Sequence, residues 1–274
     1  MNAPLAVLVD GQPCAADWLL DRALHYGDGL FETLSVREGR LRFEALHRAR
    51  LAEGSGRLGI QVDHAAVWQQ AQELAARHRS CTLKVLVSRG DAVARGYAPT
   101  GAERARVVVL AYPPSSGAQL PSRVRVATLR ATLGENPALA GIKHCNRLEQ
   151  VLARRELRSH PGAFEGLMAS SSGHLISGTM SNVFLEQDGV LMTPSLERCG
   201  IAGVMRAVVL REAAAAGTPV KVKDMPVDIL AHCSGLLLTN ALIGVLAVNE
   251  LDGRELTASN TAQALARQVS ALDG

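Results

Sequence analysis

Residues 140–151 read AGIKHCNRLEQV, and they join a loop to a helix-forming segment. Lys143 stands between a loop with proline and glycine (GENPALAGI, 134–142) and a run of helix formers (NRLEQVLARREL, 146–157). Only four of the 29 basic residues are lysine. Arginine cannot form a Schiff base and stays protonated, so a lysine in an arginine-rich chain is a candidate for chemistry. Lys221 and Lys223 alternate in VKVKD, which predicts an exposed strand face, and Lys84 in CTLKVLVS could also point outward. Lys143 is the lysine that a solvated face explains least well.

Outward from this stretch, the pattern predicts an α/β (α+β) protein of two domains. In the N-terminal part we expect strands in 4–11, 29–39, 81–90 and 105–114, with helices at 44–58 and 65–77. YPPSSGAQLPS (112–122) has no periodicity and marks a break. The predicted domains are therefore 1–113 and 123–274, with a linker at 114–122. In the second domain we expect a strand at 123–130, helices at 146–159 and 203–217, a strand-rich region between them, further strands in 219–225 and 234–251, and a helix from 257.

The composition excludes several classes of protein. Hydrophobic residues make up 47% and charged residues 20% of the chain, as in ordinary soluble proteins. A net charge of +3, without a basic block, does not favour nucleic-acid binding. No apolar stretch reaches the roughly 18 residues of a membrane span, and the opening MNAPLAVLVDGQPC lacks signal-peptide features. The five cysteines show no CxxC or metal-ligand spacing. We expect a cytoplasmic protein without metal and without a membrane partner.

Five segments together resemble a known family: DRALHYGDGLFET (21–33), SRGDAVARGY (88–97), AGIKHCNRLEQV (140–151), SGTMSNVF (177–184) and CGIAGVMR (199–206). They resemble the fold-type IV enzymes that depend on pyridoxal 5'-phosphate, and within these the aminodeoxychorismate lyase family. The resemblance implies a small N-terminal α/β domain, a larger strand-rich C-terminal domain and a cofactor bound between them. It also implies a homodimer with active sites near the dimer interface.

The resemblance implies roles for several residues in cofactor binding. Without it, the two glycines of GIAGVMR before a helix predict an anion site or an ordinary turn, since free backbone N–H groups and the helix dipole attract anions. Arg50 alone would be interpreted as a solvated helix residue. The family's pattern implies that Lys143 forms the Schiff base. It also implies that the phosphate is held by Arg50, the backbones of Val204 and Met205, and the loop at Asn240, with Asn182 among the cofactor ligands.

Ser177 departs from the pattern, because the related enzymes usually carry glutamate there to hold the pyridine nitrogen protonated. A neutral hydroxyl cannot stabilise a pyridinium as a carboxylate does. We therefore expect a weaker electron sink, which harms transamination more than an elimination that creates an aromatic ring.

The first domain is expected to recognise the substrate. In a strand over 29–36, Phe31 and Thr33 share one face, with Glu32 on the other. The resemblance directs the Phe31 face towards the cofactor, making Thr33 a candidate catalytic group, although packing explains it as well. Arg95 and Tyr97 correspond to a position that traps substrate carboxylate across the dimer interface; a plain loop arginine is the alternative.

Other polar residues stay open between structural and functional roles. Asp28 could serve a turn or a site, and His144 could support Lys143 or simply enter the helix. Asn146 and Arg147 are expected to cap the helix or to pack between domains. Cys145 is expected to be a small buried hydrophobe.

The expected reaction is the conversion of 4-amino-4-deoxychorismate to 4-aminobenzoate and pyruvate, a step in folate biosynthesis. The released Lys143 amine would remove the proton from the amine-bearing carbon, its pKa depressed by burial. The alternatives are a branched-chain or D-amino-acid aminotransferase of the same fold, or a cofactor-binding paralogue with little activity.

Overall fold

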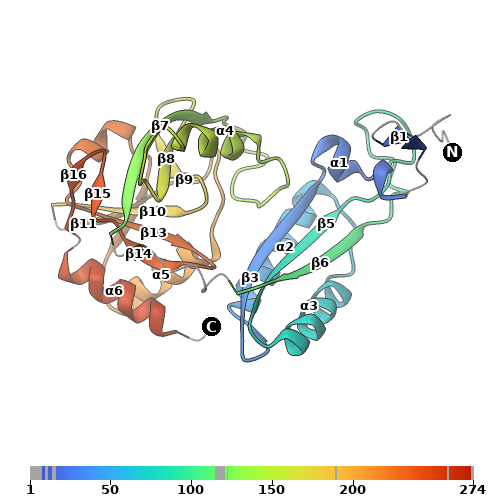
Figure 1. Ribbon diagram of the computed structural model, residues 1–274, viewed down its shortest axis with the longest axis horizontal. Helices are drawn as coiled ribbons and strands as arrows, with labels where there is room; N and C mark the ends of the chain where they lie inside the picture. The colour runs from blue at the N-terminus through green and yellow to red at the C-terminus, as the bar shows by residue number, and fades with distance from the viewer. Residues whose placement is uncertain are drawn as a thin grey trace.

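The computed structural model describes residues 8–9, 12–13, 17–114, 121, 123–188, 190–257 and 259–272. These residues form two α/β bodies that lie side by side, a smaller one from the N-terminal part and a larger one from the C-terminal part (Figure 1). The expected α/β architecture of two domains is confirmed. Within the described residues, no helix is both long and apolar enough to cross a membrane.

The smaller domain is built on one antiparallel sheet with the strand order β4-β3-β5-β6. Its strands are β3 (Gly29–Arg37), β4 (Arg40–Leu41), β5 (Cys81–Ser88) and β6 (Arg106–Tyr112). Helices α2 (Glu44–Leu58) and α3 (His64–His78) pack on it. Before the sheet come β1 (Leu8–Val9), β2 (Gln12–Pro13), the 3-10 helix η1 (Asp17–Leu20) and α1 (Arg22–Tyr26).

The two faces of this sheet have different environments. Leu30, Glu32 and Leu34 alternate along β3 and are buried, and the apolar ones join the core with the helices. Phe31 and Thr33 point the other way and are only partly buried. The predicted division of β3 into two faces is therefore confirmed, and its Phe31 face is the one that the helices leave open.

The larger domain contains two five-stranded sheets, with the strand orders β12-β11-β10-β13-β14 and β16-β15-β7-β8-β9. The strands are β7 (Arg125–Leu133), β8 (Glu165–Ser170), β9 (Leu175–Gly178), β10 (Asn182–Gln187), β11 (Val190–Pro194), β12 (Val220–Lys223), β13 (Gly235–Asn240), β14 (Gly244–Ala247), β15 (Glu250–Leu251) and β16 (Arg254–Glu255). The β7–β8, β7–β15 and β11–β12 pairs are parallel, and the remaining pairs are antiparallel.

Helices cover the outer faces of the two sheets. Apolar residues from both sheets meet in one central core that includes Leu167, Leu185 and Leu238. Helix α4 (Leu148–Leu157) packs on the β7–β8 side, whereas α5 (Val204–Ala215) and α6 (Asn260–Ala271) pack on the β10–β13 side. A short 3-10 helix, η3 (Val227–Ala231), precedes β13. Strand β8 is buried at every position because both of its faces are covered.

Most predicted elements agree with the structure, and the differences have local causes. Helix α2 has the predicted bounds. Helix α4 begins two residues later than predicted because Arg147 occupies its N-cap. Helix α6 begins at Asn260 rather than 257, since the Ser259 side chain caps it by accepting from Ala262 N. The helical turns η1 and α1 were not predicted. The linker 114–122 and the strand predicted at 4–11 lie largely outside the described residues, so the domain boundary stays a prediction.

Candidate active site

Lys143 lies where the two domains meet. Phe31 N donates to the Lys143 carbonyl at 3.0 Å and Cys145 N donates to the Gly29 carbonyl at 2.9 Å, so the lysine segment runs alongside β3. On its other side, Gly141 exchanges backbone hydrogen bonds with Gly200 and Ala202. Lys143 is therefore held between the open face of the small domain and the turn that precedes α5.

The Lys143 amine is in an unusual electrostatic environment. Its pKa is lowered from the ordinary value of 10.5 to about 7, chiefly by burial and then by the positive charge of Arg50, against the opposing effect of Glu32. Its Nζ lies 4.4 Å from the centroid of the Phe31 ring. Near neutral pH a large share of this amine is unprotonated, which is the form that attacks a carbonyl carbon.

The turn at Cys199–Gly203 presents the N-terminus of α5. Gly203 is the N-cap residue, and no side chain caps the helix. Asn182 Nδ2 donates to the Ile201 carbonyl at 2.9 Å, and a Cβ on Gly203 would lie only 1.9 Å from Asn182 Oδ1. Val204 and Met205 bury their side chains, so they offer only backbone N–H groups here. The free N–H groups of such an uncapped helix start can bind an anion.

A buried hydroxyl on the same side of the sheet also lacks a partner. Thr239 pairs with Asn182 across β10 and β13, two pairs beyond Phe184 and Leu237 and therefore on the same face, which packs against α5. Thr239 is 1% exposed, and its Oγ1 has no hydrogen-bond partner among the described residues. A buried hydroxyl without a partner, close to an uncapped helix start, suits the binding of a polar ligand.

Arg50 reaches this turn from α2. Its Nη1 donates to the Ala202 carbonyl at 3.0 Å, while its Nε and Nη2 donate to the two carboxylate oxygens of Glu32 at 2.8 and 2.5 Å. His47, one turn earlier on α2, contacts the same carboxylate through Nδ1 at 2.6 Å. Arg50 is thus no solvated residue. The buried Glu32–His47 pair escaped sequence analysis because β3 alternation alone predicts an apolar residue at position 32.

The open face of the small-domain sheet carries a second lysine. Lys84 pairs with Thr33 across β3 and β5, and its Nζ lies 5.2 Å from the Phe31 ring that Lys143 also approaches. Lys84 makes no ion pair with a carboxylate among the described residues. Lys84 thus points away from the helix-covered core, as the sequence allowed, but it is half-buried rather than fully solvated. Lys84 lies on the same face as Phe31 and Thr33 because it is paired with Thr33. This placement could be predicted only if the strand pairing were known.

Ser177 and Asn240 lie at the ends of strands beside this region. Ser177 is buried on β9, and its hydroxyl has no hydrogen-bond partner in the described part of the chain. The Asn240 side chain is occupied differently: Nδ2 donates to the Met180 carbonyl, and Oδ1 accepts from Leu242 N and Ile243 N. Asn240 thus shapes the loop after β13.

Arg95 and Tyr97 lie in the loop between β5 and β6. Tyr97 is 83% exposed, and Arg95 forms no hydrogen bond or ion pair with any described residue. Arg22 holds this loop by donating to the carbonyls of Gly96 and Tyr97. Asp28 accepts in turn from Arg22 and Arg89, so it has a structural role in orienting the loop.

The residues after Lys143 have structural partners. Asn146 Nδ2 donates to the Gly27 carbonyl, which links the helix entry to the small domain. Arg147 binds the His144 carbonyl and ring, and burial together with the Arg147 charge lowers the pKa of His144 to about 4. Cys145 is only partly buried, and burial raises the pKa of its thiol, which disfavours the reactive thiolate.

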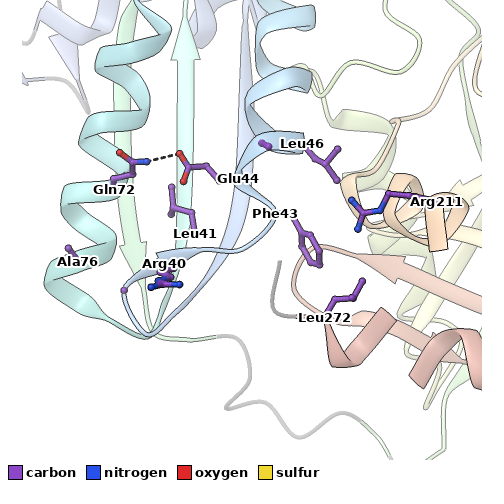
Figure 2. Close-up of a pocket in the computed structure, with 11 residues that line it drawn as sticks. Arg40, Leu41, Phe43, Glu44, Leu46, Gln72, Ala76, Arg211 and Leu272 are labelled. Carbon is purple, nitrogen blue, oxygen red and sulfur yellow. Dashed lines mark hydrogen bonds between the residues drawn. The ribbon is translucent and has the colours of Figure 1, made fainter. Parts of the chain in front are cut away.

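A large pocket lies elsewhere. It has a volume of about 810 Å³ and is lined by β4, the start of α2, α3, Arg211 and Leu272. Figure 2 shows Phe43 and Leu272 among the residues that line it, together with the hydrogen bond between Gln72 and Glu44. None of the predicted site residues lines it, so size alone does not locate the site.

The site combines an amine primed for attack on a carbonyl with an uncapped helix start at α5, whose free N–H groups can bind an anion. Such a pair fits an aldehyde cofactor that carries a phosphate. A family model, Amino-transferase class IV, matches residues 29–251, and the chain belongs to this family.

Two relatives are lyases. The aminodeoxychorismate lyase of Vibrio harveyi is 33% identical over 250 residues, which are 90% of this chain and 92% of that protein. The crystal structure of 4-amino-4-deoxychorismate lyase from Pseudomonas aeruginosa superposes with a TM-score of 0.88 at 40% identity, covering 97% of this chain and 98% of that one. A third relative, from Mycobacterium tuberculosis, is a bifunctional aminodeoxychorismate lyase / D-amino acid transaminase, 27% identical over 92% of this chain and 91% of that protein.

Proposed function

We propose that this chain is an aminodeoxychorismate lyase that converts 4-amino-4-deoxychorismate to 4-aminobenzoate and pyruvate. The observation that carries the proposal is Lys143, a lysine of depressed pKa held beside an anion site. Similarity to two lyases over at least 90% of the chain supports the reaction.

The residues fit pyridoxal 5'-phosphate. Lys143 would hold the aldehyde carbon, and the phosphate would lie against Arg50, the backbone N–H groups of Val204 and Met205, and the loop after β13. The Thr239 hydroxyl, which lacks a partner in the described residues, suits the same anion. When bound, this cofactor withdraws electrons from the carbon that bears the substrate amine.

Lys143 then has a second task. Once the substrate amine replaces it, its free amine removes the proton from the amine-bearing carbon. The depressed pKa leaves a large share of this amine unprotonated near pH 7. Loss of the enolpyruvyl oxygen from the ring follows, and aromatisation favours it. We assign the orientation of the substrate to the Thr33 hydroxyl, which lies on the same open face.

We expect two cationic side chains to bind the carboxylates of the substrate. Lys84 has no carboxylate partner in the described residues, so we assign it to a substrate carboxylate within the same subunit. We propose that Arg95, with Tyr97, reaches the active site of the other subunit in a cytoplasmic homodimer. Both assignments suit a substrate with two carboxylates.

Spectroscopy and a product assay test the proposal. Lys143→Ala should abolish the visible absorbance of the bound cofactor and all lyase activity, whereas Lys223→Ala, at an exposed strand position, should change neither. An unchanged Lys143→Ala spectrum would refute the cofactor assignment. Sustained exchange between alanine and 2-oxoglutarate, without 4-aminobenzoate release, would instead identify an aminotransferase.

A further inference from the structure

Glu32 is a buried carboxylate close to the site for which the reaction leaves no task. It lies on the helix-covered face of β3, 1% exposed, and faces Arg50 and His47 of α2. Because His47 and Arg50 are three residues apart on one helix, both side chains reach the same carboxylate. All three groups lie within one hydrogen-bonded cluster, with no solvent-exposed member.

The charges of this cluster are well defined. Burial alone would raise the pKa of Glu32, but the charge of Arg50 and the hydrogen bonds from Arg50 and His47 outweigh it and lower the pKa to about 2. Burial lowers the pKa of His47, so its ring is neutral at pH 7 and Nδ1–H donates to Glu32. The cluster therefore contains one negative and one positive charge.

The guanidinium of Arg50 has five N–H bonds. Two of them point to Glu32 and one to the Ala202 carbonyl. Two remain, one on each terminal nitrogen. Since Ala202 is two residues before the first residue of α5, these N–H bonds lie at the helix start. Two terminal N–H bonds form the edge that pairs with two phosphate oxygens.

We propose that Glu32, supported by His47, is a positioning residue that fixes Arg50 for the phosphate of the cofactor. The proposal rests on the phosphate site of the proposed function. Without Glu32, the Arg50 side chain would lose conformational entropy each time a phosphate binds, which makes the free energy of binding less favourable. Glu32 thereby sets the affinity for a phosphate-bearing ligand, without touching that ligand.

Two ligands separate positioning from general folding. Pyridoxal 5'-phosphate and pyridoxal differ only in the phosphate, so their relative affinity for the apoprotein isolates the Arg50 contact. Glu32→Gln should weaken the binding of pyridoxal 5'-phosphate about 10- to 100-fold and the binding of pyridoxal by less than about twofold. Glu44→Gln is the matched control, because Glu44 pairs with Arg48 on the same helix away from the site, and it should change neither affinity.

An Arg50→Gln background tests whether Glu32 acts through Arg50. In that background, adding Glu32→Gln should leave unchanged the ratio of the affinity for pyridoxal 5'-phosphate to the affinity for pyridoxal. Equal losses for both ligands in Glu32→Gln alone, or a further change of the ratio in the Arg50→Gln background, would overturn the proposal. If Glu32→Gln does not fold, His47→Leu should lower the ratio and His47→Asn, which keeps a donor, should restore it; an unchanged ratio in His47→Leu contradicts the proposal.

Calorimetry with inorganic phosphate makes the inference separable from the proposed reaction. Phosphate should bind the wild-type apoprotein and bind Glu32→Gln at least about tenfold more weakly. If neither aldehyde reacts with Lys143 but the phosphate result holds, the proposed function fails and the role of Glu32 stands. If the aldehydes react normally and phosphate affinity is unchanged in Glu32→Gln, the role of Glu32 fails alone.

Discussion

At the residue scale, the proposed chemistry depends on a few side chains. Only some of their roles can be predicted from the sequence. Lys143 is predictable from its scarcity and from the motif around it. Lys84 and Glu32 are not, because their roles depend on strand pairing and on a helix that arrives from elsewhere in the chain. Neither the strand pairing nor the position of that helix can be read from the sequence alone.

Ser177→Glu should move the enzyme towards transamination. A carboxylate at this strand end would hold the pyridine nitrogen protonated and strengthen the electron sink. Keto-acid exchange between alanine and 2-oxoglutarate should rise on the order of tenfold, which corresponds to about 1.4 kcal/mol of barrier. Ser171→Glu, at an exposed position in the turn before β9, is the control. No gain in Ser177→Glu over this control would remove the argument that Ser177 favours elimination.

Glu32 should make the stability of the protein sensitive to acid. Its pKa is lower in the folded protein than the ordinary value of 4.5, so the stabilisation is fully present above pH 4.5 and is lost as the pH falls towards 2. The size of the shift corresponds to a loss on the order of 3 kcal/mol. Chemical denaturation of the apoprotein between pH 5 and pH 2 should show a steeper fall for wild type than for Glu32→Gln. If the free energy of unfolding fell equally with pH in both proteins, the depressed pKa of Glu32 would be contradicted.

At the element scale, the helices and strands follow their local patterns, whereas their caps do not. Alternation along β3 and the apolar periodicity of α2 suffice to predict both elements. The starts of α4 and α6 were misplaced because an N-cap depends on backbone angles that composition does not encode. The turn before α5 is similar: two glycines predict a turn, but only the close approach of Asn182 shows why Gly203 is required.

Gly203→Ala should disrupt this turn. The added Cβ would lie 1.9 Å from Asn182 Oδ1, so Asn182 or the start of α5 must move. We expect a loss of about 1–3 kcal/mol in the free energy of unfolding and weaker binding of pyridoxal 5'-phosphate. Gly56→Ala, inside α2 with open space around the new Cβ, is the control and should stabilise by up to about 1 kcal/mol. Wild-type cofactor affinity in Gly203→Ala would argue against the turn as the anion site.

At the scale of the whole molecule, one chain brings together the residues of the proposed cofactor site, whereas Tyr97 is 83% exposed and the Arg95 side chain forms no hydrogen bond or ion pair among the described residues. Both belong to an exposed loop held by Arg22. A second subunit accounts for their position if each loop serves the other subunit's Lys143. Mixing inactive variants tests this arrangement.

Lys143→Ala and Arg95→Ala should complement each other when the subunits exchange. Each mixed dimer then contains one site with an intact lysine and an intact arginine, so an equal mixture should recover about a quarter of wild-type activity. A pair of Lys143→Ala and Lys84→Ala should not recover, because both residues serve the same site. Recovery by neither pair would place Arg95 in its own subunit's site or outside the active sites.

The most direct test of the central claim is a coupled assay in which aminodeoxychorismate is generated enzymatically and both products are followed. Wild-type protein loaded with pyridoxal 5'-phosphate should release 4-aminobenzoate and pyruvate in equal amounts, and Lys143→Ala should release neither. Absence of 4-aminobenzoate from the wild-type reaction, or its undiminished release by Lys143→Ala, would contradict the assignment of this chain as a lyase that acts through Lys143.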